Sequence, residues 1–226
     1  MGSCGYLGLA PMSAEYPKAL CFLVPYAPTF KEYSEQKYHE LLERTGIQVD
    51  AASSAISRFL KSVPIKHACI PRGGQDPRTL MTTLPHKLAA TRAGLGWIGK
   101  SSLLVTPRHG PCLSLATLLI DVDLPCGNPV TTSKCGECVN CVDACLHHCI
   151  RGVNWRPGMP RDDLLDAHLC SAKREVFRSA IGHKHECGLC LLTCPFGKEI
   201  GSKTMRGADW QAPGPTDSDE VLASRA

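Results

Sequence analysis

Nine of the fourteen cysteines in this 226-residue chain lie between residues 135 and 194, at spacings that suit a metal centre. Residues 135–145 follow the pattern C-x2-C-x2-C-x3-C, and residues 187–195 follow C-x2-C-x3-C-P. Three closely spaced thiolates can reach three irons of one cubane, while the fourth cysteine begins the next helix and points at the other cluster. The spacing therefore predicts two [4Fe–4S] clusters for one-electron transfer.

The crossed ligation of such motifs assigns most of the ligands. The ligands expected for the first cluster are Cys135, Cys138, Cys141 and, from the second motif, Cys194. Those expected for the second cluster are Cys187, Cys190 and the crossing Cys145. The second cluster is then one ligand short, because the second motif has one cysteine fewer. Cys170 is the first candidate for that position, and Cys149 is the rival.

A structural zinc site is the alternative, because two C-x2-C pairs can build a Cys4 site. Zinc would use four of the seven motif cysteines and leave three clustered thiols without a role. The clusters are therefore the favoured interpretation. Outside the motifs, Cys21 lies in an apolar run and is expected to be a small buried hydrophobe.

A glycine-rich loop is the second feature that could do chemistry. It consists of Gly94, Leu95, Gly96, Trp97, Ile98, Gly99 and Lys100. The loop matches G-x-G-x-x-G, but a dinucleotide site needs a strand before the glycines and a helix after them. Here a helical segment precedes and an apolar strand follows, so a dinucleotide site is not expected. The glycines would let the backbone approach a flat ligand or another chain segment, and a tight turn around a core tryptophan is the alternative.

The elements that position these residues can be predicted for the first half of the chain. A short apolar run at 19–26 predicts a buried strand. Helically spaced apolar residues from Leu41 to Leu60 predict a helix that closes near Ser62, ahead of Pro64. The further expected elements are a loop at 71–85, a short helix at 86–92, and strands at 103–106 and 113–122.

Turn residues and composition suggest the domain organisation. The turn-rich stretch 125–129 is expected to link an α/β domain at 1–124 to a double-cluster module at 125–206. A tail at 207–226, rich in Pro, Gly, Ser and Asp, is expected to be flexible.

Charge and hydropathy exclude several classes of partner. Lys and Arg together number 25 against 21 for Asp and Glu, and no dense basic run occurs, so nucleic-acid binding is not expected. No stretch approaches the roughly 18 consecutive apolar residues of a membrane span, and the N-terminus lacks the pattern of a signal peptide. We therefore expect a cytoplasmic protein that does not bind membranes. In that reducing compartment the thiols should be ligands rather than disulfides.

Together, these motifs resemble the epoxyqueuosine reductase family. The resemblance rests on residues 85–100 (PHKLAATRAGLGWIGK), the Leu-Leu-Val-Thr segment after them, both cysteine motifs, and Leu-Asp-Ala-x-x-Cys ending at Cys170; it covers about residues 19–200. It implies a cobalamin-binding α/β domain joined to a bacterial ferredoxin-like α+β module with two [4Fe–4S] clusters, an architecture shared with reductive dehalogenases. It also implies that Cys170 completes the second cluster and that the loop at 94–100 faces a corrin whose cobalt lacks its lower base.

Three features depart from the family pattern. Full-length members carry a helical-repeat domain that helps hold tRNA after the clusters, whereas this sequence stops at Ala226. The family's catalytic aspartate has no match in residues 81–85, and its Asp-Tyr-His motif corresponds loosely to residues 37–39. We therefore take Tyr38 as the candidate proton donor, with the ammonium of Lys37 stabilising the phenolate. Two solvated residues on a helix face are the alternative.

Three functions are compatible with these patterns. The leading hypothesis is a reductase that passes electrons through its clusters to a bound cobalamin, to reduce a small substrate or the corrinoid of a partner protein. The second is a ferredoxin-type electron-transfer protein without a substrate, which would not need the domain at 1–124. The third is a tRNA epoxyqueuosine reductase, against which the three departures count. A ferredoxin or flavodoxin is the expected electron donor.

Overall fold

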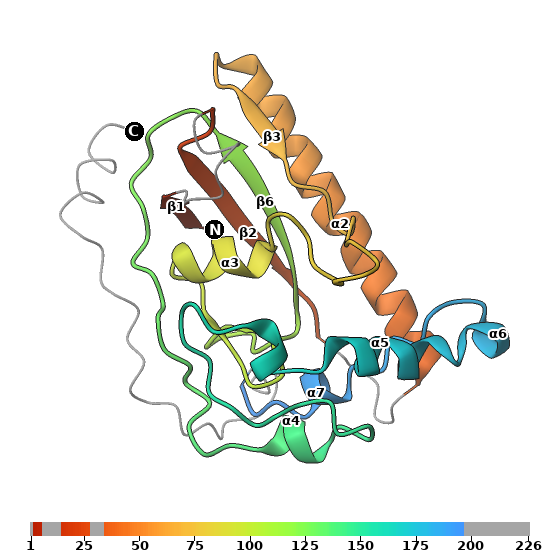
Figure 1. Cartoon of the computed structure of the whole chain (residues 1–226). Coiled ribbons are helices and arrows are strands. Elements are labelled where there is room, and N and C mark those ends of the chain that lie inside the picture. Colours follow the sequence, from red (N-terminus) through yellow and green to blue (C-terminus); the bar gives the residue numbers. More distant parts are fainter. Residues whose placement is uncertain (1, 6–14, 28–33, 197–226) are drawn as a thin grey trace.

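A four-stranded antiparallel sheet lies at the centre of the computed structural model, which describes residues 2–5, 15–27 and 34–196 (Figure 1). Its strand order is β1-β2-β6-β3. The bounds of the strands are β1 Gly2–Gly5, β2 Lys18–Pro25, β6 Leu113–Ile120 and β3 His67–Cys69. β2 and β6 pair along their whole length, from Lys18 opposite Ile120 to Pro25 opposite Leu113. These two strands are the most apolar segments of the first half, which explains their central position.

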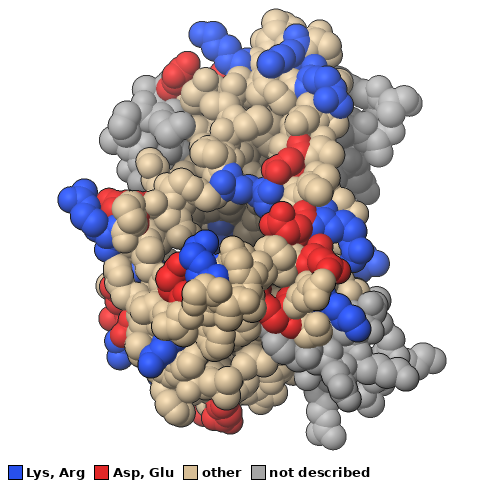
Figure 2. All heavy atoms as spheres, turned by 90° about the vertical axis from the view of Figure 1, so that its right-hand side faces the viewer, with Lys and Arg blue, Asp and Glu red and all other residues tan. Residues whose placement is uncertain are grey.

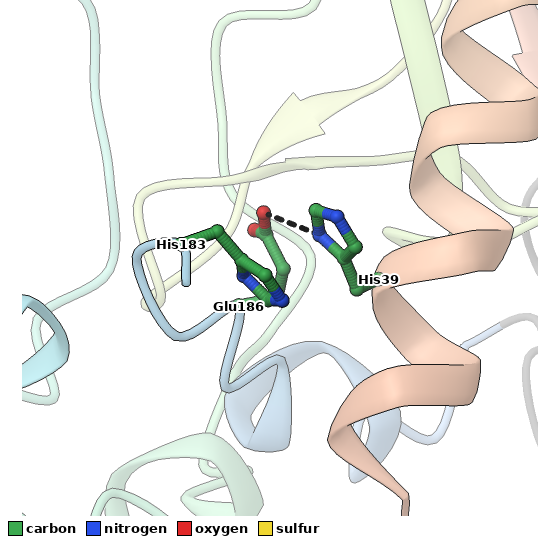
Figure 3. A group of neighbouring side chains, drawn as sticks. All are labelled: His39, His183 and Glu186. Atoms are coloured by element: carbon green, nitrogen blue, oxygen red, sulfur yellow. Dashed lines mark ion pairs between the residues drawn. The ribbon is translucent and has the colours of Figure 1, made fainter. Parts of the chain in front are cut away.

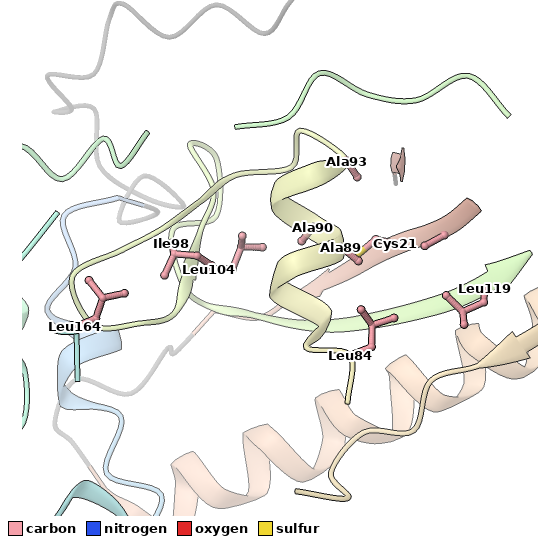
Figure 4. Packing of buried hydrophobic residues seen from close by; sticks show 10 residues of the cluster. Cys21, Leu84, Ala89, Ala90, Ala93, Ile98, Leu104, Leu119 and Leu164 are labelled. Atoms are coloured by element: carbon pink, nitrogen blue, oxygen red, sulfur yellow. The ribbon is translucent and has the colours of Figure 1, made fainter. Parts of the chain in front are cut away.

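One helix covers each face of this sheet, so the fold is α/β (Figure 1). On β2 and β6 the side chains alternate between the two faces. Cys21 and Leu119 pack against α3 (His86–Arg92), as the close view in Figure 4 shows. Phe22 and Leu118 pack on the other face, in one apolar cluster with Val49 of the long helix α2 (Glu35–Ser62). Cys21 is fully buried, as its apolar surroundings in the sequence predicted.

The ends of α2 follow from local sequence. The side chain of Ser34 caps the N-terminus by accepting a hydrogen bond from the backbone N–H of Lys37. The C-terminus falls at Ser62, as predicted, because Pro64 cannot continue the helix. The helix begins six residues before Leu41, the first apolar position of the predicted pattern.

The predicted elements around the glycine loop are only partly right. The short helix at 86–92 is confirmed as α3. The strand expected at 103–106 is reduced to β5 (Leu104–Val105), which pairs with β4 (Trp97–Ile98) inside the glycine loop itself. The strand expected at 113–122 ends at Ile120. The prediction missed β1 and β3, because both are short and lack an alternating apolar pattern.

Residues 125–196 form short helices joined by loops. Their bounds are α4 Asn140–Asp143, a 3-10 turn Arg161–Asp163, α5 Ala167–Glu175, α6 Arg178–Ile181 and α7 Leu189–Leu192. Within residues 125–196, the expected β component amounts to one isolated bridge, between Ile150 and Leu165. Turns around the cysteines leave little extended backbone to pair. Among the helices that the structure describes, none is long and apolar enough to cross a membrane.

The two predicted domains share their apolar packing. Leu164 lies in the same buried cluster as Ala89 and Ile98 (Figure 4). Leu191, from the second cysteine motif, packs in another cluster with Tyr26 and Tyr38. The boundary at 124/125 therefore separates the two cysteine motifs from the sheet, although the apolar core runs across it. The predicted tail at 207–226 lies outside the described residues.

Candidate functional site

Four cysteines from the two motifs gather at one place. Cys194 is partly buried, and this burial together with the neighbouring sulfurs of Cys135, Cys141 and Cys138 raises its pKa to about 12. The pKa of Cys141 is also raised, first by burial and then by Cys135 and Cys138. Local turns present these thiols, since the backbone N–H of Cys138 donates to the carbonyl of Cys135 at 3.0 Å. The structure thus brings Cys194 to the first motif although the two lie far apart in sequence.

A second group of four thiols lies beside the first. Burial raises the pKa of Cys190 to about 12, with further contributions from Cys187, Cys141, Cys170 and Cys145. Burial is also the main cause of the raised pKa of Cys170, to which Cys187 and Cys145 add. The nine cysteines between residues 135 and 194 form no disulfide. The second group therefore unites Cys145 and Cys170 with the second motif.

The rival Cys149 lies at the edge of this second group. Its side chain is 1% exposed, and burial, then Cys145 and Cys170, raise its pKa to about 12. Its backbone N–H donates to the Sγ of Cys145 at 3.3 Å, and its own thiol lies 3.6 Å from the carbonyl of His147. Cys149 thus supports the sulfur of Cys145 through its backbone.

A cavity of about 640 Å³ opens where the α/β unit meets the cysteine segments. The 71–85 loop, α3 and the start of β6 form one side, and residues between Trp155 and Leu164 form another. Leu191, which directly follows Cys190, also lines it. Arg72, Lys87 and Arg161 contribute cations, and none of the described lining residues is an aspartate or glutamate. The cavity is therefore mostly apolar. Arg72 and Arg161 are ion-paired with Asp50 and Asp162, which are not among its lining residues, and Leu191 connects the cavity to the second cysteine motif.

Lys87 is the most perturbed charge in this cavity. Its Nζ donates to the carbonyl oxygen of Ser102 at 2.7 Å and to the Ser102 hydroxyl at 3.1 Å. Burial, with a smaller contribution from Arg161, lowers the pKa of Lys87 to about 8. A lysine so placed can give up a proton near neutral pH. Its burial is not visible in the sequence, although Lys87 lies within the family-like segment 85–100.

The glycine loop is packed closely against the chain's own backbone. A Cβ at Gly96 would overlap the carbonyl oxygen of Val105, and one at Gly94 would lie 2.7 Å from the carbonyl oxygen of Asn128. Trp97 is 1% exposed, and its ring is nearly perpendicular to that of Phe196, with 4.9 Å between the ring centroids. Of residues 94–100, only Ile98 lines the cavity. The tight turn around a core tryptophan is thus the arrangement found.

The end of the glycine loop lies against the first thiol group. A Cβ at Gly99 would lie 3.6 Å from the sulfur of Cys135, and the buried Lys100 acts on Cys141 by lowering its pKa, against the stronger effect of burial. The end of the loop therefore borders the first cysteine group.

Exchanging Gly96 for alanine should destabilise the protein, because the new Cβ meets backbone that cannot turn away. We expect a loss of about 1–3 kcal/mol in the free energy of unfolding, as for overpacked cores. Gly46→Ala is a matched control. Gly46 lies inside α2, and the three atoms nearest to its Cβ would belong to the guanidinium at the end of the Arg72 side chain, 3.0 Å or more away, so this change should cost much less than Gly96→Ala. Thermal unfolding of the iron-loaded protein measures both, and equal midpoints would contradict the packing role of Gly96.

The predicted pairing of Lys37 with Tyr38 is wrong. The segment is a regular helix, in which neighbouring side chains diverge by about 100°. Lys37 is exposed, whereas Tyr38 is 2% exposed, so the pair is not the solvated alternative either. Burial raises the pKa of Tyr38 to about 12 despite its hydrogen bond with Tyr26. A Cβ at Gly188 would overlap the Tyr38 ring, so Tyr38 supports the Cys187–Cys190 turn.

Comparisons with known proteins agree on one family. The chain is 33% identical over 120 residues to the epoxyqueuosine reductase of Aliivibrio fischeri, and 36% identical over 110 residues to that of Cyclobacterium marinum. These matches cover 49% and 48% of this chain, but 30% and 36% of the relatives. The matched part is thus about a third of the relatives' length. No protein-family model matches the chain.

Solved structures share the fold. The epoxyqueuosine reductase of Bacillus subtilis superimposes with a TM-score of 0.54 at 22% identity, over 84% of this chain and 50% of the other. An epoxyqueuosine reductase solved with a modified tRNA-Tyr stem loop gives a TM-score of 0.55 at 21% identity, again over 84% of this chain and 50% of the other. Together with the curated matches, these similarities confirm the resemblance seen in the motifs.

Proposed function

We propose that this chain, a divergent relative of the epoxyqueuosine reductases, is an iron–sulfur reductase whose cavity takes the molecule to be reduced. Its similarity to those enzymes suggests a reductase. One observation carries the proposal further. Leu191 lines the cavity and directly follows Cys190, so a bound molecule would lie beside the second thiol group.

Eight cysteines would hold the two clusters, which supply one-electron transfer when bound. The first set is Cys135, Cys138, Cys141 and Cys194. The second is Cys145, Cys170, Cys187 and Cys190. The raised pKa values of several of these thiols fit this role, because thiolates crowded in a buried place need a cationic centre between them. We propose that Cys149 is not a ligand. Its backbone N–H instead donates to the sulfur of Cys145, and hydrogen bonds of this kind tune the reduction potential of a cluster.

The resemblance also implies a corrinoid, which when bound would supply a strongly reducing cobalt. The loop at 94–100 fits less well as its site, because Gly94 and Gly96 face the chain's own backbone and only Ile98 of this loop lines the cavity. The cavity fits better: Leu113 and Met159 offer apolar surface to a flat macrocycle, and Lys87 and Arg161 offer donors to acceptors on its rim. We propose the cavity as the place where corrinoid and substrate meet.

The names of the relatives favour an epoxyqueuosine-type nucleoside as the substrate, over the corrinoid of a partner protein. A pure electron carrier would have no use for a cavity beside its second cluster. A substrate carried on tRNA would be expected to need a basic surface that binds the phosphates. On the face shown in Figure 2, basic and acidic side chains are interspersed rather than gathered into one basic patch. We therefore expect the nucleoside itself to carry most of the recognition.

Lys87 is our candidate for the proton donor, in place of Tyr38. Removing oxygen from an epoxide consumes protons as well as electrons, and a general acid must lie within hydrogen-bond reach of that oxygen. Lys87 lines the cavity, and its Nζ donates two hydrogen bonds to Ser102. An ammonium has three N–H groups, so the third can donate to a bound ligand. Arg161 is paired with Asp162, but its guanidinium has further N–H groups that could donate to the ligand nearby.

The test is turnover of two probes, an epoxyqueuosine-containing tRNA-Tyr stem loop and the free epoxyqueuosine nucleoside. Protein purified without oxygen is reduced chemically and incubated with each probe, with and without cobalamin. We expect mass spectrometry to show loss of one oxygen from the nucleoside, dependent on both iron and cobalamin. Full iron content without any conversion of either probe would instead support the electron-carrier function.

A further inference from the structure

A second set of metal-ligating side chains lies outside both cysteine groups. His39 comes from the first turns of α2, and His183 and Glu186 come from the segment between α6 and Cys187 (Figure 3). One nitrogen or oxygen atom from each lies within 4.8 Å of the other two. Residues far apart in sequence thus place two imidazoles and one carboxylate around a single point.

The hydrogen bonds leave one nitrogen on each imidazole available. The Nδ1 of His183 lies 3.1 Å from the carbonyl oxygen of Lys184. That oxygen can only accept, so Nδ1 carries the proton and Nε2 keeps its lone pair. The Nδ1 of His39 is shielded from solvent and has no hydrogen-bond partner among the described residues. It lies 3.6 Å from Oε1 of Glu186. A buried nitrogen without a partner is costly, and a metal ion would satisfy it.

Surrounding groups hold the carboxylate in place. Arg174 donates to Oε2 of Glu186 at 3.2 Å, which leaves Oε1 for a ligand. The backbone N–H of Glu186 donates to Glu35 at 2.8 Å, and Glu35 also lies 3.9 Å from Nδ1 of His183. Carboxylates and carbonyls behind ligating histidines are typical of metal centres, where they fix the ring and its tautomer.

We propose that His39, His183 and Glu186 bind one divalent transition-metal ion, for which zinc is the best fit to two imidazoles and a carboxylate. The two imidazole rings are stacked, with 3.6 Å between their centroids and 12° between their planes. Their nitrogen lone pairs, which lie in the ring planes, are therefore nearly parallel and do not converge on one point. Binding of the ion would turn the His183 ring until its Nε2 and the Nδ1 of His39 both face the ion. Because Glu186 precedes Cys187, the ion would clamp the second cysteine motif to α2. This site is separate from the proposed reductase site.

The experiment uses iron-loaded protein, freed of loosely bound metal by a weak chelator and titrated with zinc chloride against a chromophoric competitor. We expect about one zinc per chain, unchanged iron content, and a higher unfolding midpoint with zinc than without it. His39→Ala and Glu186→Gln should each weaken zinc binding by at least about 100-fold. His168→Ala, which removes an exposed histidine outside the set, should bind zinc as the unchanged protein does.

Zinc K-edge absorption identifies the ligands. A shell of nitrogen and oxygen neighbours supports the site. A shell of sulfur neighbours would mean that cysteines hold the zinc and would overturn the proposal. Equal zinc affinity in the His39 and Glu186 variants, or no stoichiometric binding, would also overturn it and leave a hydrogen-bonded cluster. Measuring the iron content tests the proposed reductase function independently of the zinc site, because the cysteines could hold iron whether or not zinc binds to His39, His183 and Glu186.

Discussion

Replacing Cys170 by alanine should remove about half of the irons, whereas replacing Cys149 should leave about eight per chain, because each cubane holds four. Cys170 lies close enough to Cys187 and Cys145 for their sulfurs to raise its pKa. Cys149 instead reaches Cys145 through a backbone N–H that an alanine keeps. Iron and acid-labile sulfide, measured after purification without oxygen, distinguish the two variants.

The pair of variants is matched, since both remove one thiol next to Cys145. Cys194→Ala extends the test to the first cluster. It should also remove about four irons, although Cys194 lies in the second motif. The cluster that remains in each variant should keep its electron-resonance signal. Loss of iron in Cys149→Ala but not in Cys170→Ala would reverse the assignment, and zinc in place of iron in the unchanged protein would replace the clusters altogether.

The grouping of the cysteines could be predicted because ligand spacing is a local property with a long-range consequence. A cubane needs its fourth thiolate from elsewhere, so the spacing of residues 135–145 already required a crossing partner such as Cys194. The closing of α2 near Ser62 was predictable for a similar reason, since Pro64 acts on its own neighbours. The helix at 86–92 also follows from local sequence.

The packing partners of the glycine loop could not be predicted from its sequence. Glycine permits close approach but does not say what approaches. The partner of Gly96 is the Val105 carbonyl, which reaches it because β4 and β5 form a two-residue ribbon. Tyr38 failed for a different reason. Helix periodicity showed that it diverges from Lys37, but its burial depends in part on Leu191 and Gly188, which come from the other half of the chain.

Lys87→Met should lower turnover at pH 7 by at least about 100-fold, the usual scale for a general acid. The pKa of Lys87 is lowered to about 8, so its ammonium is mostly intact at pH 7 and mostly lost at pH 9. Turnover of the unchanged protein should therefore fall as the pH rises through about 8. Lys61→Met, which removes an exposed lysine at the end of α2, should change neither turnover nor its pH profile.

Lys87→Arg separates proton transfer from charge. An arginine keeps the positive charge but does not give up a proton in this pH range. It should therefore bind the ligand as the unchanged protein does and still lose turnover. Rescue of turnover by arginine would reduce Lys87 to an electrostatic contact.

Stability gives an independent check on the buried lysine. The pKa of Lys87 in the folded chain is about 8, below its ordinary value of 10.5. Between those two pH values the unfolded chain binds more protons at this group, so its contribution to the free energy of unfolding rises with pH. Lys87→Met should remove that rise, which urea unfolding of iron-loaded protein at pH 7.5 and 9.5 would measure. The same rise in both proteins would mean that the ammonium is solvated, and would remove the physical basis for its role as an acid.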